Sequence, residues 1–397
     1  MQLTHLSLSN FRSYIRLDTD IPGRILLLSG GNAQGKTTLL EALFYCASFM
    51  SPLARNDRQL ITFSASSEPL SVGRIVASFE REGKSHKIEV RFIQETDGEN
   101  SRIRKEILLD GMKSTAQKAI GSFPAVLFLP QMTRILEGPP DERRRYLNIM
   151  LSQSVQGYAR ALSEYKQILQ RRNALLKILS ERKTDPAQLD YWDLMMAQRA
   201  AILMKARSGA IRYLQEKGRD IHNELTDGKE VFRLQYTPGY DPFEFAAVDH
   251  PTIEEMDENA LVEGYRYFLQ SHREKDIQKG STGKGPHRDD FTVHGNEVDL
   301  CAYGSRGQIC TTLLTMKFSE MEWMRERTHT SPLLLLDETL AELDEKRGKD
   351  LLTRLERYEQ AILTTTDCTH FPQSFISRNS LWVIENGVIK DKSEYEN

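Results

Sequence analysis

The sequence predicts an α/β fold in which a mixed sheet is built from both ends of the chain and a helical lobe is inserted between them. Near the N-terminus, the apolar run 24–29 leads into a glycine-rich loop and then a helix-like stretch. Near the C-terminus, the apolar run 331–336 ends in two carboxylates. Between them, residues 141–225 repeat apolar side chains at three- and four-residue steps, which is typical of amphipathic helices.

The glycine-rich loop has the form of a phosphate-binding loop. Its sequence fits the pattern G-x-x-x-x-G-K-[ST] in the required setting of strand, loop and helix. Glycines let successive N–H groups face phosphate oxygens, and the helix N-terminus adds its positive dipole end. Lys36 is predicted to reach the outer phosphates of ATP, and Thr37 to bind Mg²⁺. The nucleotide-binding residues predicted here are Gly30, Gly31, Asn32, Ala33, Gln34, Gly35, Lys36, Thr37 and Thr38. The alternative is a glycine-rich turn that happens to carry a lysine.

The second apolar run suits a buried parallel strand whose carboxyl end faces a ligand. Four leucines at 333–336 are followed by Asp337 and Glu338. Asp337 is predicted to hold Mg²⁺ through water, and Glu338 to orient or deprotonate the attacking water. Taken alone, this pattern fits an ordinary strand-to-loop exit equally well.

Two further loops stand in the order found in ABC-type ATPases. Residues 304–308 read Gly-Ser-Arg-Gly-Gln and resemble the signature loop in its Ser-x-Gly-Gln form, while residues 341–344 resemble the D-loop. The resemblance implies that Ser305, Gly307 and Gln308 touch ATP held by a second subunit, and that Asp344 lies beside it. The alternative for Ser305 is a simple helix N-cap.

Blocks along most of the chain resemble the RecF family of recombination mediators. They include the opening strand and Asn-Phe-Arg turn at 3–14 and the blocks at 138–147, 170–176, 285–290 and 363–367. The resemblance implies an ABC-type P-loop ATPase head, a mixed sheet with an antiparallel sub-sheet. It also implies that Arg12 contacts the nucleotide and that Gln131 is the Q-loop residue near the metal. The chain departs from the family pattern at Ile309, Cys310 and Asn148.

The same resemblance implies an activity and partners. It indicates a weak DNA-dependent ATPase that uses ATP and Mg²⁺ and forms an ATP-dependent homodimer on gapped, duplex or single-stranded DNA. RecR, RecO and RecA are the implied protein partners, and the expected location is the cytoplasm. A transport ATPase subunit and a small-molecule P-loop kinase are the alternative functions, and DNA-stimulated ATPase activity would separate the first hypothesis from both.

The pattern of elements predicts three segments. Residues 1–140 form the first part of the head, 141–278 the helical lobe, and 279–397 the second part of the head. Strand hairpins are predicted within 70–92 and after 103–109, a core strand at 124–129, and arms of at most about 45 residues, or about 70 Å. The glycine-rich stretch 279–286 is predicted to be flexible.

Composition narrows the DNA site to a local patch. With 53 Lys and Arg against 56 Asp and Glu, the net charge is −3, so the whole chain offers no bulk attraction to phosphates. No run approaches the ~20 apolar residues of a membrane span, and the four scattered cysteines argue against a zinc site or a disulfide framework. The predicted DNA-contacting cations are Arg55, Arg58, Arg102 and Lys105, with Arg104, Arg143 to Arg145, Arg171 and Arg172 as further candidates.

Overall fold

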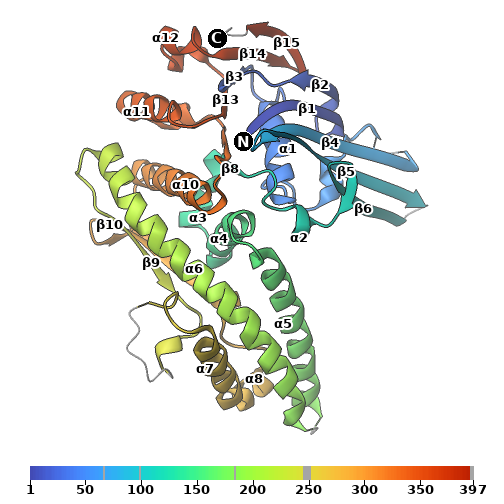
Figure 1. The fold of residues 1–397 in the computed structure, drawn as a ribbon, viewed down its shortest axis with the longest axis vertical. Coiled ribbons are helices and arrows are strands. Elements are labelled where there is room, and N and C mark those ends of the chain that lie inside the picture. Colours follow the sequence, from blue (N-terminus) through green and yellow to red (C-terminus); the bar gives the residue numbers. More distant parts are fainter. Residues whose placement is uncertain (66–67, 98–99, 183–184, 245–251, 394–397) are drawn as a thin grey trace. The chain divides into compact units, whose positions relative to one another are not determined.

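The computed structural model describes residues 1–65, 68–97, 100–182, 185–244 and 252–393 (Figure 1). Their contacts divide the chain into two units. The first unit joins residues 1–132 to 320–397, and the second comprises residues 133–319. Helix α10 (Arg306–Thr328) begins in the second unit and ends in the first. The three segments predicted from the sequence remain a prediction about domains.

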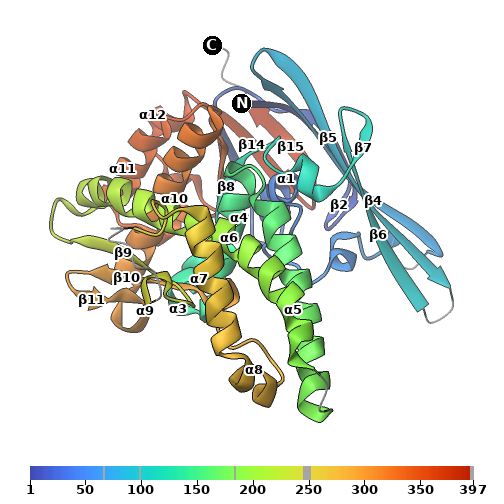
Figure 2. The ribbon, with the colours of Figure 1, turned by 60° about the horizontal axis from the view of Figure 1, so that its bottom comes forward.

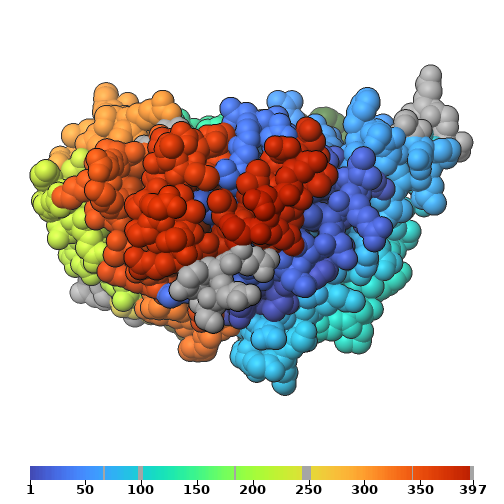
Figure 3. All heavy atoms as spheres, turned by 90° about the horizontal axis from the view of Figure 1, so that it is seen from above, coloured from blue at the N-terminus to red at the C-terminus, as the bar shows by residue number. Residues whose placement is uncertain are grey.

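A mainly parallel sheet forms the centre of the first unit. Within the described residues its strand order is β15-β14-β3-β13-β12-β8, and only β15 runs antiparallel to its neighbour. The strands are β3 (Ile25–Ser29), β8 (Ala125–Phe128), β12 (Leu333–Leu336), β13 (Ala361–Thr365), β14 (Ser380–Glu385) and β15 (Val388–Ser393). The central strands are apolar on both faces and buried, as expected of a covered parallel sheet. Segments from the two ends of the chain therefore lie side by side, as Figure 3 shows in blue and red.

An antiparallel sheet forms the other layer of the first unit. Its order is β2-β1-β4-β5-β6-β7 in the part of the chain that the structure describes (Figure 2). The strands are β1 (Gln2–Phe11), β2 (Tyr14–Asp20), β4 (Leu70–Arg81), β5 (Lys84–Asp97), β6 (Asn100–Leu109) and β7 (Met112–Ser114). The two predicted hairpins are confirmed as β4–β5 and β6–β7. Helix α1 (Lys36–Ser48) packs on one face, where the rings of Tyr45 and Phe92 meet edge to face at 5.0 Å.

Short helices complete the first unit. They are α2 (Ala116–Ala119), α11 (Glu345–Leu355) and α12 (Gln373–Ile376), with single turns η1 (Asp57–Leu60), η3 (Pro130–Thr133), η7 (Thr339–Glu342) and η8 (Cys368–His370). Of the helices in the described residues, none combines the length and the apolar character that crossing a membrane requires.

The second unit is mostly helical. Its helices are α3 (Arg134–Glu137), α4 (Pro140–Ser154), α5 (Tyr158–Glu181), α6 (Leu189–Thr226), α7 (Glu258–Ser271), α8 (Arg273–Lys279) and α9 (Leu300–Tyr303), with turns η4 (Pro186–Gln188), η5 (Pro242–Glu244) and η6 (Pro286–Arg288). Strands β9 (Phe232–Thr237), β10 (Asp290–Gly295) and β11 (Val298–Asp299) form a small sheet. The arms α5 and α6 have 24 and 38 residues, within the predicted limit.

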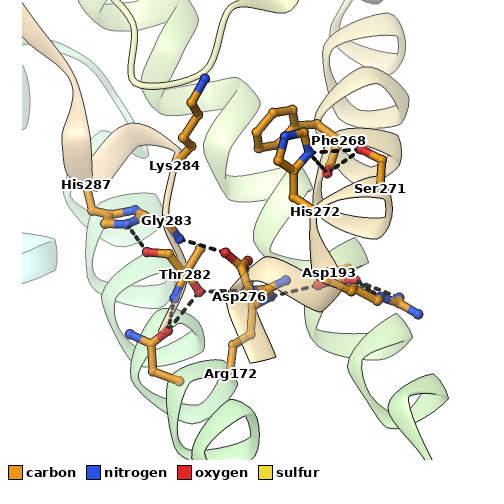
Figure 4. Close-up of polar contacts among 12 residues, drawn as sticks. Arg172, Asp193, Phe268, Ser271, His272, Asp276, Thr282, Gly283, Lys284 and His287 are labelled. Atoms are coloured by element: carbon orange, nitrogen blue, oxygen red, sulfur yellow. Dashed lines mark hydrogen bonds and ion pairs between the residues drawn. The ribbon is translucent and has the colours of Figure 1, made fainter. Parts of the chain in front are cut away.

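The predicted flexible stretch 279–286 is instead held by buried polar contacts, so this prediction is wrong (Figure 4). The backbone N–H and hydroxyl of Thr282 both donate to Asn173 Oδ1 at 2.8 Å, and Arg172 donates to the same hydroxyl at 2.7 Å. A Cβ at Gly285 would lie 1.9 Å from the Tyr265 hydroxyl. Glycine at position 285 therefore allows the chain to pack closely against helix α7. Glycine content in a sequence indicates backbone freedom, whereas helices distant in sequence supplied the contacts that remove it.

Candidate nucleotide-binding site

The loop between β3 and α1 forms an open cradle of backbone groups. Gly30 and Gly35 have φ values of 152° and 109°, which favour glycine. A Cβ at Gly30 would lie only 2.3 Å from the carbonyl oxygen of Ile384 on β14. Gly35 is the N-cap of α1 and provides no side-chain cap, so the first N–H groups of the helix are left for an anion.

Lys36 lies folded back into this cradle. Its ammonium donates to the carbonyl oxygens of Gly30 and Gly31 at 2.6 and 2.9 Å, and its side chain is 5% exposed. It also lies 3.3 Å from Glu338 Oε1. A cation in so confined a position binds an incoming phosphate by exchanging these partners for phosphate oxygens.

Thr37 and Asp337 come together from opposite ends of the chain. The Thr37 hydroxyl donates to the two carboxylate oxygens of Asp337 at 2.8 and 3.0 Å, and the Thr364 hydroxyl donates to Oδ1 at 2.8 Å. Burial raises the pKa of the Asp337 carboxyl above its ordinary value. A positive ion beside Asp337 would offset that effect, because it favours the ionised carboxylate.

Glu338 follows at the carboxyl end of β12 in an unusual backbone conformation. Its φ is 46°, in the left-handed region, and its N–H donates to the Thr364 hydroxyl at 3.0 Å. The carboxylate accepts from the Thr366 N–H at 3.1 Å. The parallel strands β3 and β12, which flank β13, thus place one carboxylate beside Thr37 and the other beside Lys36, at the edge of the sheet where ligands bind in such folds.

The pair of Thr37 and Asp337 fits a magnesium ion. Mg²⁺ is held in phosphate-binding sites by one or two protein oxygens together with phosphate oxygens and water. A hydroxyl and a carboxylate within 2.8 Å of each other provide that oxygen set. Gln131, the predicted third contributor, is exposed in η3, and within the described residues it makes no hydrogen bond to Thr37 or Asp337.

A cavity opens beside the cradle, and Arg12 is one of the residues that line it. Its volume is about 790 Å³, and its lining includes Thr38, Leu53, Arg58 and Phe63. Its polar and apolar lining is the mixture expected of a small-molecule site.

Glu41 of α1 holds Arg12 in place. The guanidinium donates twice to Glu41, at 2.9 and 2.8 Å, and the Glu41 side chain is 2% exposed. The Ser51 hydroxyl also donates to Glu41, and accepts from the N–H groups of Leu53 and Ala54. Glu41 therefore links the helix of the phosphate loop to two walls of the cavity, and the sequence patterns gave it no role.

Because Arg12 is predicted to contact the nucleotide, Glu41→Gln is expected to weaken ATP binding about tenfold by loosening a charge-assisted pair. The same change made in an Arg12→Ala background should have almost no further effect. Nucleotide titrations of the four proteins measure this coupling. Asp57→Asn is the matched control, since Asp57 accepts from Tyr45 of the same helix without touching Arg12. Equal loss in both backgrounds would show that Glu41 acts through folding alone.

The signature and D-loop residues form helix caps in this structure. The Ser305 N–H donates to Gln308 Oε1 at 3.0 Å, and the Gln308 N–H donates to the Ser305 hydroxyl at 3.3 Å, a capping box at the start of α10. Gly307 is exposed between them. Asp344 caps α11 by accepting from the Arg347 N–H at 3.0 Å. The capping alternative for Ser305 is thus present, and it leaves the residue exposed for a partner.

Two supports of the cradle were missed by the sequence patterns. The Tyr14 hydroxyl donates to the Gly35 carbonyl at 3.1 Å. The turn between β14 and β15 donates to Gln34 through the N–H groups of Asn386 and Gly387, at 2.6 and 2.9 Å. Neither contact leaves a local signal, since each joins segments that are distant in sequence. The remaining loop residues, Asn32 and Ala33, are exposed.

The candidate DNA contacts differ in availability. Arg55, Arg58 and Arg102 are exposed. Lys105 instead donates to Tyr45 Oη at 2.8 Å and to the Phe49 carbonyl at 3.0 Å, and lies 3.3 Å from Asp57. Its ammonium is therefore used within the protein.

Two further arginine candidates are structural. Arg172 is 0% exposed and pairs with Asp193 and Asp276, so its prediction as a surface contact is wrong. Arg143 is 7% exposed and makes two hydrogen bonds to Asp290. A pattern of cations does not reveal which ones find buried carboxylates.

Asn148, one of the departures from the family pattern, lies in a buried network of the second unit. Its side-chain oxygen accepts from the Tyr158 hydroxyl at 2.7 Å and from Arg207 at 3.0 Å. Arg207 also pairs with the buried Asp289 at 2.6 Å. Ile309 and Cys310 are buried in α10.

Comparisons with known proteins show the family of the chain. The family model described as the RecF/RecN/SMC N terminal domain matches residues 2–387. The DNA replication and repair protein RecF of Chloroflexus aggregans is 34% identical, with 98% of this chain and 99% of the relative covered. The same protein of Chloroflexus aurantiacus is 35% identical over the same shares of the two chains.

Solved structures give the same result. A structure of the recombination mediator protein RecF with ATPrS in the RecFOR pathway superposes with a TM-score of 0.82 at 29% identity, covering 98% of this chain and 97% of that one. The RecF–ATP structure gives 0.83 at 28% identity, covering 99% and 97%. An SMC head, at 15% identity and a TM-score of 0.54, shares the fold. The predicted ABC-type head with a helical lobe is confirmed, and the chain belongs to the RecF family.

Proposed function

We propose that the protein is an ATP-dependent DNA-binding clamp of recombinational repair and replication restart. The observation that carries this proposal is the meeting of Thr37 with Asp337, and of Lys36 with Glu338, beside an uncapped helix N-terminus. These are the parts that phosphoryl transfer from ATP requires. The relatives' description as DNA replication and repair proteins, and the RecF–ATP structure, support the same activity.

The residues of the site divide the chemistry between them. Lys36 and the N–H groups of α1 bind and orient the phosphates. Thr37 and Asp337 would hold Mg²⁺, which would supply positive charge against the phosphates. Lys36 pairs with Glu338 until it turns to the nucleotide. The Glu338 carboxylate is then able to accept a proton from the attacking water. Tyr14 and Gln34 keep the loop in shape during this exchange.

The site of one chain is completed by a second copy. Ser305 and Gly307 are exposed at the start of α10, and their N–H groups and hydroxyl suit a terminal phosphate held by another molecule. ATP binding therefore joins two copies around DNA, and slow hydrolysis releases them. The description of a solved relative as part of the RecFOR pathway supports RecO and RecR as partners. Assistance to RecA loading is the proposed outcome.

Sedimentation and DNA titration test this function together. With Mg²⁺ and ATP the protein is expected to sediment as a dimer, and without nucleotide as a monomer. Gapped, duplex and single-stranded DNA should bind more tightly in the presence of ATP and should stimulate hydrolysis. A monomer under all conditions, with ATPase activity indifferent to DNA, would contradict the proposal and favour another class of P-loop protein.

A further inference from the structure

One face of the antiparallel sheet is covered by α1, and the opposite face carries charged side chains in register. Successive residues of a strand point to opposite faces, so Arg91 lies on the far side from the buried Phe92. The backbone pairing places Arg74 opposite Arg91, and Arg91 opposite Glu106. This face belongs entirely to the first unit.

The charged side chains form a connected ladder across four strands. Glu89 accepts from Arg74 at 2.8 Å and from Arg91 at 2.6 Å. Glu106 lies 3.9 Å from Arg91, 3.3 Å from Arg104 and 3.5 Å from Lys113. We call these side chains the arginine ladder; it comprises Arg74, Glu89, Arg91, Arg104, Glu106 and Lys113.

The two signs of charge in the ladder differ in depth. The carboxylates of Glu89 and Glu106 are 6% and 15% exposed, whereas the cations are 38% to 79% exposed. Hydrogen bonds, first from Arg74, lower the pKa of Glu89, so the deep carboxylate stays ionised. The carboxylates thus hold the cationic groups from below, and the outward layer is positive.

Two more arginines extend the positive layer. Arg16 of β2 lies in the same cross-strand row through Ser9, and Arg102 of β6 is two residues from Arg104 on the same face. Both are exposed, and within the described residues neither has an ion pair. The same register also places the exposed carboxylates of Asp18 and Glu95 on this face, so the six cations named here stand against four carboxylates, Asp18, Glu89, Glu95 and Glu106.

The spacing and fixation of these cations suit a phosphate backbone. Neighbouring strands lie about 4.8 Å apart, so the cations, which extend from β2 to the sixth strand of the sheet, β7, span about 24 Å across it. Guanidinium groups already oriented by carboxylates lose less freedom when they bind a phosphate. Two exposed apolar side chains, Leu70 and Val72, share this face at the start of β4, and the charged row lies beyond them. Its chemistry favours a flat, sequence-independent polyanion.

We propose that the arginine ladder, with Arg16 and Arg102, is a binding surface for the sugar–phosphate backbone of duplex DNA. The inference rests on the proposed function and deepens it by assigning a DNA-contacting face. It also assigns a role to Arg102 and Arg104 and excludes Lys105, which points to α1.

The test is the salt dependence of duplex binding by the full-length protein with Mg²⁺ and ATP. The double variant Arg91→Gln with Arg104→Gln removes two phosphate-binding cations. The slope of log affinity against log salt should become shallower by about 1.8, and affinity at 0.1 M salt should fall about 10- to 100-fold. ATP affinity should stay within twofold of the wild-type value, because the nucleotide cradle adjoins α1, which packs on the opposite face of the sheet.

Two variants separate binding from a merely structural ladder. Glu106→Gln disturbs the same contacts but removes negative charge, so DNA affinity should be unchanged or higher. Arg233→Gln is the matched control, because Arg233 is also an exposed strand arginine, 56% exposed and 2.8 Å from Glu297, but lies in the second unit. This variant should change the slope of log affinity against log salt by no more than about 0.9, the value for one phosphate contact.

The outcomes are distinguishable. The surface is overturned if the double arginine variant binds DNA with the wild-type slope, or if Glu106→Gln weakens binding as much as the arginine variant does. In both cases wild-type binding would leave the proposed function standing. Failure of the wild-type protein to bind any DNA in the presence of ATP would overturn the function and the surface together.

Discussion

Glu338→Gln is expected to slow ATP hydrolysis about 100- to 1000-fold while leaving ATP binding intact. A positioned general base contributes roughly this factor, and an amide of the same shape cannot take the proton. The amide oxygen can still accept from the Thr366 N–H, so the loop after β13 should keep its position. Because hydrolysis releases the proposed dimer, the variant should accumulate as a dimer with ATP, as measured by sedimentation beside single-turnover kinetics.

Glu345→Gln is the matched control for this variant. Glu345 is 86% exposed at the start of α11 and pairs with Lys349 at 2.7 Å. Loss of the Glu345 carboxylate should leave the rate of ATP hydrolysis within twofold of the wild-type rate. Wild-type hydrolysis in the Glu338 variant would remove this residue from the chemistry and make another group the base.

Lys36→Arg is expected to weaken ATP binding about 10- to 100-fold and to abolish the ATP-dependent dimer. The Lys36 ammonium occupies a small space between two carbonyl oxygens and is 5% exposed. The planar guanidinium is larger and directs its donors in a fixed fork, so it cannot reproduce these contacts or reach the same phosphate oxygens. Each lost charge-assisted hydrogen bond costs about 1.5–3 kcal/mol.

Equilibrium titration with a slowly hydrolysed ATP analogue measures this loss without interference from turnover. Lys349→Arg provides the control, since that lysine is 64% exposed and its ammonium pairs with Glu345 at 2.7 Å. Near-normal affinity of the Lys36 variant, with a dimer still forming, would contradict the assignment of Lys36 to the phosphates.

Together the two variants test the contact between Lys36 and Glu338. Both remove their 3.3 Å pairing, yet they are expected to have opposite effects on the dimer. A shared loss of stability would instead lower ATP binding in both. Thermal unfolding of each variant, with and without nucleotide, distinguishes these cases because a ligand stabilises only a protein that binds it.

Local patterns were sufficient where the chemistry lies on adjacent residues. The phosphate loop needs its strand, glycines, lysine and helix in one continuous stretch, and the structure has all of them in order at 25–48. The alternation within β4 and β5 and the helical repeats of α5 and α6 follow from burying one face of each element. Such signals depend on neighbours along the chain, and the sequence contains those neighbours directly.

Long-range partners decided what the patterns could not. Glu41 carries no local mark of its contact with Arg12, and the stretch 279–286 looks flexible until Asn173 and Arg172 of α5 are placed against it. The arginine candidates divide in the same manner. Arg172 is buried against carboxylates, Lys105 is directed to α1, and Arg104 stands exposed above Glu106.

The sequence by itself therefore determined the α/β class and the phosphate loop, and it predicted the two carboxylates after β12, because each depends on the identity and periodicity of consecutive residues. Only the tertiary structure decided which hydroxyl meets Asp337, which carboxylate orients Arg12, and which cations remain exposed. Those outcomes depend on burial and on charges brought together from distant segments, where the cost of leaving a buried charge unpaired selects the partner.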